Sequence, residues 1–220
     1  NYDNYAKRIH LSQYKALEKN GYVFVHFSKN SETDLNNTSE NAPISNHELS
    51  DSGFSQEDYV SEEVIVDFKC DWSRIIENHL DILHIFWVHG DTIPDKEVNK
   101  NVLVSFNQKI NVTPKYIEST YYYKNEPTKE FIRIKFIPPG RILIYKGDPS
   151  ISRYLQVLDH IPLGNNKARV IVRHYRKFLK NKILNNLILF KETQRKIFYK
   201  IFDEDYMILK TQTYNHDMGF

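Results

Sequence analysis

The sequence is organised around residues 77–89, which read ENHLDILHIFWVH. This stretch places His79, His84 and His89, together with Glu77 and Asp81, among large apolar side chains. A helix of this composition is costly to bury unless its polar groups have partners, and a metal ion is one such partner. Neutral imidazoles are common ligands of iron, zinc and copper, so His84 and His89 are candidate metal ligands. The alternative is that each histidine belongs to an ordinary amphipathic helix.

The five-residue spacing between His84 and His89 limits how they can share one metal. On a regular helix the two side chains lie about 140° apart, so the helix must bulge or end near His89. Gly90 suits such an end. The zinc-protease motif H-E-x-x-H has a spacing of four and a glutamate after the first histidine. Because Ile85 follows His84, the sequence argues against a zinc protease.

Asp81 lies three residues before His84, so the two side chains share a face on a helix. Its carboxylate can accept the second ring N–H of a metal-bound histidine, or of a histidine from elsewhere, and so fix the tautomer.

The longer run W-x4-E-N-x2-D-x2-H-x4-H over residues 72–89 resembles the iron-binding segment of Rieske-type non-haem iron oxygenases. The resemblance implies that His84 and His89 are two ligands of a 2-His-1-carboxylate Fe(II) site. It also implies that Asp81 is the carboxylate that passes electrons in from a Rieske [2Fe–2S] cluster. Asn78 then belongs to the catalytic site.

A late acidic run contains the candidate for the third ligand. Three adjacent acidic residues are typical of a solvated helix face, but the resembling family carries its carboxylate ligand on a late helix, in an E-D-x-x-x-L-x-x-Q-like pattern. Asp205, with Leu209 and Gln212, fits this pattern. Asp203 and His216 remain alternatives, whereas we expect Glu204 to point to a different face of the helix.

The remaining pattern predicts an α+β fold. Strands are expected over residues 21–27, 64–72, 102–112, 116–123, 130–136, 141–145, 154–161 and 169–175. Turn residues separate the later strands and favour an antiparallel meander. One helix is expected from an N-cap at Ser73 towards His89, and a second over residues 182–211. The resemblance implies a helix-grip (START-like) curled sheet around this late helix.

The order of these segments predicts three parts. Residues 1–28 resemble the end of a Rieske domain, residues 29–62 form a polar loop or linker, and residues 63–220 form the mononuclear iron catalytic domain. A single cysteine, Cys70, excludes an internal disulfide and is expected to be buried. A Rieske cluster needs two cysteines and two histidines, so the [2Fe–2S] cluster is expected on a missing or partner domain.

Composition narrows the class of partner. The 30 Lys and Arg residues nearly balance the 28 Asp and Glu residues, giving a net charge of +2 and no case for nucleic acid binding. There is no run of eighteen apolar residues and no signal peptide, and the chain starts with Asn1, so we expect a fragment or processed form. The 15 Tyr and 13 Phe residues suit an apolar pocket, although most are expected in the core. His160 and His174 are expected to be satisfied or exposed strand residues.

The resemblance implies an oxygenase that uses O2 on an apolar cyclic substrate, with a ferredoxin or reductase as electron donor and a homotrimeric assembly. The sequence is most similar to the branch with pheophorbide a oxygenase and chlorophyllide a oxygenase. This branch implies a chlorophyll-derived tetrapyrrole as a possible substrate. The expected location is the cytoplasm or, as in this branch, the plastid in association with thylakoids. Two alternatives remain: a non-catalytic module of the same fold that binds a hydrophobic ligand, and a zinc metallohydrolase, which the lack of a glutamate base beside the histidines disfavours.

Overall fold

The structure is a computed structural model that describes residues 15–19, 22–26, 60–90, 92, 106–123, 126–148, 152–178 and 190–217. The chain divides into two compact units, Asn1–Glu48 and Leu49–Phe220. In the first unit, strands β1 (Lys15–Lys19) and β2 (Tyr22–His26) form an antiparallel pair. Strand β2 confirms the strand predicted over residues 21–27. Strand β1 was not predicted, because residues 1–17 lack the alternation that marks a half-buried strand.

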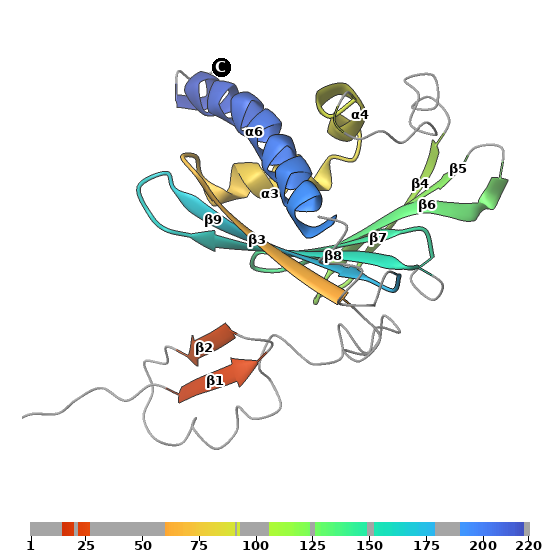
Figure 1. The fold of residues 1–220 in the computed structure, drawn as a ribbon, viewed down its shortest axis with the longest axis horizontal. Coiled ribbons are helices and arrows are strands. Elements are labelled where there is room, and N and C mark those ends of the chain that lie inside the picture. The colour runs from red at the N-terminus through yellow and green to blue at the C-terminus, as the bar shows by residue number, and fades with distance from the viewer. Residues whose placement is uncertain are drawn as a thin grey trace, which may run out of the picture. The chain divides into compact units, whose positions relative to one another are not determined.

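The second unit is built on a seven-stranded antiparallel sheet with the order β3-β9-β8-β7-β6-β5-β4 (Figure 1). Strands β4 to β9 follow one another as a meander, and β3 pairs along the whole of β9. The bounds are β3 (Val60–Phe68), β4 (Phe106–Val112), β5 (Ile117–Tyr123), β6 (Glu126–Ile137), β7 (Arg141–Lys146), β8 (Tyr154–Pro162) and β9 (Ala168–Arg176). The predicted meander is therefore confirmed.

Strand β3 begins at Val60, so the last residues of the stretch predicted as a linker, residues 29–62, already belong to the sheet. Residues 29–59 lie outside the part of the chain that the structure describes, as do most of the residues predicted as a loop between Gly90 and Asn101.

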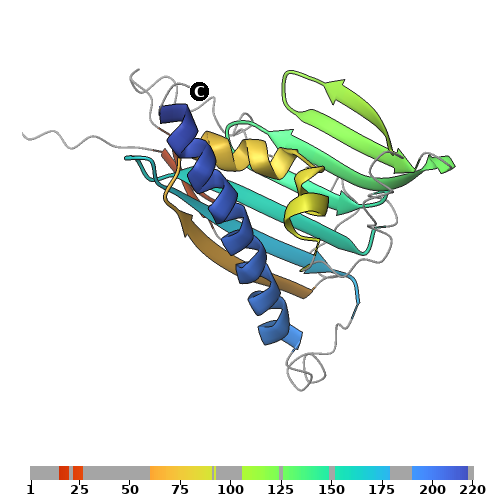
Figure 2. The same cartoon turned by 90° about the horizontal axis from the view of Figure 1, so that it is seen from above.

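Alternation along the strands gives the sheet one apolar face. In β9 the even-numbered residues are buried, and Val172 lies opposite Val64 of β3. Helices α3 (Trp72–Leu80), α4 (His84–Val88) and α6 (Phe190–Asp217) all lie over this inner face (Figures 1 and 2). The fully buried Leu209 of α6 belongs to the core, and the ring of Phe202 meets Phe68 edge to face at 6.1 Å. The predicted α+β class, with a curled antiparallel sheet and a long late helix, is confirmed.

The helical segment after β3 is not continuous. The prediction of one helix from Ser73 towards His89 was wrong in two respects. The N-cap is Asp71, whose Oδ1 accepts from the Ser73 backbone N–H at 2.9 Å, and Ser73 is itself helical. Helix α3 ends at Leu80 with Asp81 as its C-cap, and α4 starts anew at His84. The predicted end near His89 is confirmed, since α4 stops at Val88.

Helix α6 starts at Phe190 within the residues that the structure describes, and it extends beyond the predicted end at residue 211 to Asp217. Cys70 is fully buried in the core, and burial raises the pKa of its thiol to about 11, as expected of a structural rather than a reactive cysteine. Among the described helices, none combines the length and apolar character needed to cross a membrane.

Candidate metal centre

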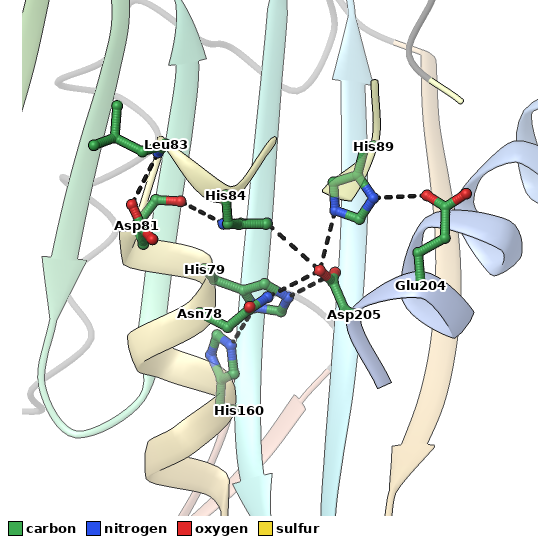
Figure 3. A network of polar contacts seen from close by, with 9 residues as sticks. All are labelled: Asn78, His79, Asp81, Leu83, His84, His89, His160, Glu204 and Asp205. Carbon is green, nitrogen blue, oxygen red and sulfur yellow. Dashed lines mark hydrogen bonds and ion pairs between the residues drawn. The ribbon is translucent and has the colours of Figure 1, made fainter. Parts of the chain in front are cut away.

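The break between α3 and α4 brings the two candidate histidine ligands together. His84 begins α4 and His89 follows its last residue, so the chain does not have to hold both rings on one regular helix. Their ring centroids lie 5.3 Å apart at an interplanar angle of 80°. One ligand atom from each of His84, His89 and Asp205 lies within 4.8 Å of the others. Figure 3 shows the three side chains pointing towards one another. Residues more than a hundred positions apart in sequence thus converge on one point.

Hydrogen bonds on the far side of each ring fix which nitrogen faces this point. His84 Nδ1–H donates to the backbone carbonyl of Asp81, and His89 Nδ1–H donates to Glu204 Oε2 at 2.8 Å. A carbonyl and a carboxylate can only accept, so the Nε2 atom of each neutral ring carries the free lone pair. These Nε2 atoms lie 3.5 Å and 3.0 Å from Asp205 Oδ1. Both lone pairs are therefore available to the same ion.

Asp205 is almost completely buried on the inner side of α6. Burial raises the pKa of its carboxyl group, but the neighbouring His89, His79 and His84 outweigh this effect and lower the pKa below the usual value. Asn78 of α3 donates from Nδ2 to Asp205 Oδ1 at 3.0 Å. The carboxylate is thus held ionised in the protein interior, where it needs a positive partner.

A second pair of histidines lies beneath Asp205. His160 Nδ1–H donates to the carbonyl of Gly140 at 2.8 Å, so its Nε2 accepts from His79 Nδ1–H, also at 2.8 Å. This leaves the lone pair of His79 Nε2 towards Asp205 Oδ2, 3.9 Å away. Gly140 permits the close approach, because a Cβ there would lie 2.7 Å from the His160 carbonyl oxygen. Burial lowers the pKa of His79 to about 3 and of His160 to about 4, so both rings are neutral.

His89 and His84 differ in their electrostatics. Burial lowers the pKa of His89, but the carboxylates of Asp205 and Glu204 outweigh it and the pKa is raised. For His84 burial prevails over Asp205, and the pKa is lowered. Without a metal, a proton on His89 is what best neutralises the two carboxylates.

The donor set fits a divalent transition metal. Two imidazole nitrogens and one carboxylate oxygen are the ligands of mononuclear non-haem Fe(II) sites. Within the part of the chain that the structure describes, the buried Nε2 atoms of His89 and His79 form no hydrogen bond, although Asp205 is close to both. For the neutral ring of His89, an ion at this point would accept the Nε2 lone pair, which no donor among the described residues meets.

The other predicted site residues are placed as follows. The Asp81 side chain is exposed, and its Oδ1 accepts from the backbone N–H of Leu83 at 2.9 Å. The prediction that its carboxylate would accept from His84 was wrong, because the Asp81 backbone carbonyl does so. Asp203, the alternative ligand, is exposed. The side chains of Gln212 and His216 lie outside the described residues.

Sequence reasoning missed the contacts of Glu204 and His79. Glu204 was expected on a different helix face, but its longer side chain reaches the second ring nitrogen of His89. The E-D pair at 204–205 was the only signal for this contact. His160 was expected to be satisfied or exposed and is satisfied by Gly140 and His79.

Comparison with protein families gives one match. The sequence profile of the vanillate O-demethylase oxygenase C-terminal domain matches residues 68–219. This range holds all three residues that converge in Figure 3, with Asn78, Asp81 and Glu204. A comparison with curated proteins finds no match to this chain.

Several solved structures share the fold. The quaternary ammonium Rieske monooxygenase CntA, in complex with L-carnitine, has a TM-score of 0.56 and 15% identity over 92% of this chain and 50% of its own. NdmA of Pseudomonas putida CBB5, a QL mutant with caffeine, has a TM-score of 0.62 and 12% identity over 89% and 51%. Dicamba monooxygenase bound to dicamba has a TM-score of 0.61 and 10% identity over 93% and 60%. This chain thus spans about half the length of the first of these structures.

Proposed function

The chain belongs to the vanillate O-demethylase oxygenase C-terminal domain family, and we propose that it is the catalytic domain of a Rieske-type monooxygenase. In this proposal His84, His89 and Asp205 hold one mononuclear Fe(II). The observation that carries it is the convergence of one ligand atom from each of these residues to within 4.8 Å. A carrier of hydrophobic ligands has no use for two ring nitrogens aimed at a buried carboxylate, so the non-catalytic alternative is disfavoured.

When bound, Fe(II) supplies the activation of O2 at the positions that three protein ligands leave open. The protein's own residues do the positioning. The Asp81 carbonyl and the Glu204 carboxylate each hold the Nδ1–H of one ligand histidine, so both rings present Nε2. Asn78 donates to Asp205 Oδ1 and limits the rotation of that carboxylate. The buried surroundings of His89 and Asp205 keep bulk water away from the ligand atoms.

In this proposal a Rieske [2Fe–2S] cluster on another domain or a partner chain would supply the electrons. The given sequence cannot hold that cluster itself, because it has one cysteine and the cluster needs two. Residues 1–28 are proposed as the end of such a domain. The iron domain is proposed to include residues 63–220 and to begin at Val60, the first residue of β3. Asp81 is the proposed entry point for electrons. Its exposed carboxylate follows α3 and lies three residues before His84, so a partner can reach it from solvent. A ferredoxin or reductase as donor, and a homotrimer, belong to the same proposal.

The substrate we propose is a small organic molecule that carries a methyl group on oxygen or nitrogen. The family description names vanillate O-demethylase, and the structural relatives were solved with L-carnitine, caffeine and dicamba. The narrower prediction of a chlorophyll-derived tetrapyrrole and a plastid location finds no support in these matches.

Hydrogen peroxide provides a test that needs no cluster domain, because it supplies both the oxygen atom and the oxidising equivalents. An O-methyl substrate and one peroxide yield the free hydroxyl compound, formaldehyde and water. We expect the Fe(II)-loaded protein to release formaldehyde from at least one member of a panel of aryl methyl ethers and N-methyl amines. The His84→Ala protein is the control. Equal release by both proteins, or no release from any member of the panel, would contradict the proposed reaction.

A further inference from the structure

The imidazole of His89 is held between two consecutive carboxylates of α6. Asp205 Oδ1 lies 3.0 Å from Nε2, and Glu204 Oε2 accepts from Nδ1–H at 2.8 Å on the opposite side of the ring (Figure 3). The Glu204 side chain is about a quarter exposed, whereas Asp205 is buried. Glu204 therefore reaches from the rim of the centre to the side of His89 that faces away from Asp205.

Thr92 closes a ring of hydrogen bonds around this contact. Its backbone N–H donates to the His89 carbonyl at 2.9 Å, and its hydroxyl donates to Glu204 Oε1. Both Glu204 oxygens are thus engaged, one by the ring of His89 and one by Thr92. We call His89, Thr92 and Glu204 the Glu204 clamp. Since His89 follows the last residue of α4, the clamp also ties the end of that short helix to α6.

Resting on the proposed Fe(II) site, we propose that Glu204 is a positioning residue of the metal centre, which fixes the tautomer and ring orientation of His89 through the clamp. The two ligand histidines are then supported unequally. A neutral backbone carbonyl holds His84, and an ionised carboxylate holds His89. A charged acceptor gives the stronger hydrogen bond and makes the opposite ring nitrogen a better donor to a metal.

The competing reading is that Glu204 is an ordinary surface acid paired with Lys200. Those charged atoms lie 3.9 Å apart with i,i+4 spacing, and the Lys200 side chain is largely exposed. Such a pair contributes little, and it does not involve His89. The two readings differ in whether loss of the Glu204 carboxylate weakens metal binding.

Cobalt(II) is a suitable probe, because its visible absorption and its shifted proton resonances report on the ligands directly. We would measure its dissociation constant by chelator competition in the wild type, Glu204→Ala, Glu204→Gln and Thr92→Val. Asp203→Ala, which removes the exposed neighbouring acid, and Lys200→Ala are the matched controls. We expect Glu204→Ala to weaken cobalt binding by about 10- to 100-fold, the range typical of lost outer-shell partners. Glu204→Gln should lose less, because its amide oxygen can still accept from Nδ1–H.

Exchange of the ring N–H protons separates positioning from a general loss of stability. In the cobalt-loaded wild type, we expect two slowly exchanging, shifted N–H resonances, one from His84 and one from His89. Glu204→Ala should speed the exchange of one of them and leave the other unchanged, while both controls match the wild type. Unchanged affinity and unchanged exchange in Glu204→Ala would overturn the clamp alone. Failure of the wild type to bind cobalt would overturn the metal centre and the clamp together.

Discussion

Two histidine sites lie on the inner face of the same sheet, and they differ in what their ring nitrogens face. At the candidate metal centre, His84 and His89 direct Nε2 towards Asp205 Oδ1, at 3.5 Å and 3.0 Å. At the second site, His174 of β9 is as buried as His89, and its ring stacks on Phe198 at a centroid distance of 3.6 Å. We call His174, Tyr154, Gln156 and Phe198 the His174 cluster.

The His174 cluster also contains a ring nitrogen that forms no hydrogen bond among the described residues, and a buried acid lies beside it on strand β3. Its Nδ1 meets the Tyr154 hydroxyl at 3.0 Å, while Nε2 forms no hydrogen bond within the described residues. Glu62 is its register partner on β3, yet this carboxylate lies 3.8 Å from Arg176, whose charge it faces. Burial of a histidine near an acid is therefore not enough for a metal site. A metal site also requires that two nitrogen lone pairs and a carboxylate oxygen converge on one point.

The largest expected effect is the loss of metal-dependent stability when Asp205 of the candidate metal centre is replaced. Free metal at 100 times its dissociation constant should raise the free energy of unfolding of the wild type by about 2.7 kcal/mol. Asp205→Ala should show no such increase, because its ligand atom is gone, whereas His174→Gln should retain it. Denaturant titration with and without cobalt(II) measures this difference. A metal-dependent gain in Asp205→Ala equal to that of the wild type would remove Asp205 from the ligand set.

The next largest effect is expected from Asp81. Its carboxylate lies close in sequence to the candidate ligand His84 but caps the Leu83 N–H and does not join the candidate ligands. Asp81→Asn keeps an oxygen that can cap the Leu83 N–H and keeps the backbone carbonyl that holds His84. We expect unchanged metal content and loss of turnover once a Rieske partner supplies electrons. Turnover with that partner and metal content are the measurements. Normal turnover in this variant would contradict the proposed role of Asp81 in electron transfer.

His174 should instead contribute to the loss of stability in acid, as the buried and neutral His79 and His160 also do. Burial lowers the pKa of His174 to about 3, while an unfolded histidine has a pKa near 6.5. The unfolded chain therefore binds more protons between these values, and this stabilising contribution is complete above pH 6.5 and lost as the pH falls. We expect His174→Gln to reduce the slope of unfolding free energy against pH by about 1.4 kcal/mol per unit between pH 6 and 4. An unchanged slope in urea titrations would show that His174 is not buried in its neutral form.

The smallest expected effect is a difference in unfolding free energy between two variants, each of which loses one hydrogen bond at one of the two histidine sites. Asn78 donates to the ionised Asp205, whereas Gln156 donates to the neutral Tyr154 hydroxyl at 2.6 Å. Hydrogen bonds to charged groups contribute about 1.5–3 kcal/mol and neutral ones about 0.5–1.5 kcal/mol. Metal-free Asn78→Ala should therefore lose more unfolding free energy than Gln156→Ala. The reverse order in paired denaturant titrations would contradict the charge assigned to Asp205.

Local patterns were sufficient for the sheet, because strand alternation and turn residues predicted the meander. They did not select Asp205, since three acids in a row are typical of a solvated helix face. The resemblance to the iron oxygenases proposed Asp205, through Leu209 and Gln212 at matching offsets. The break after Leu80 was not predictable in detail, because Asp81, Ile82 and Leu83 include neither glycine nor proline. The sequence shows only that the two histidines need some departure from a regular helix.

Long-range contacts were beyond local reasoning. His79 meets His160 across 81 positions of sequence, and Glu204 meets His89 across 115. Neither pair has a local period or motif that marks it, since each depends on how α3, α4, α6 and β8 pack together. The resemblance to iron oxygenases named the ligands, and only the fold reveals what supports them.

One iron should bind where His84, His89 and Asp205 meet. Elemental analysis of protein purified without oxygen, with His84→Ala prepared in parallel, tests this proposal. We expect about one iron per wild-type chain, no acid-labile sulfide, and loss of the iron in the variant, as a 2-His-1-carboxylate site requires. Iron retained in full by His84→Ala, or no metal in the wild type, would contradict it.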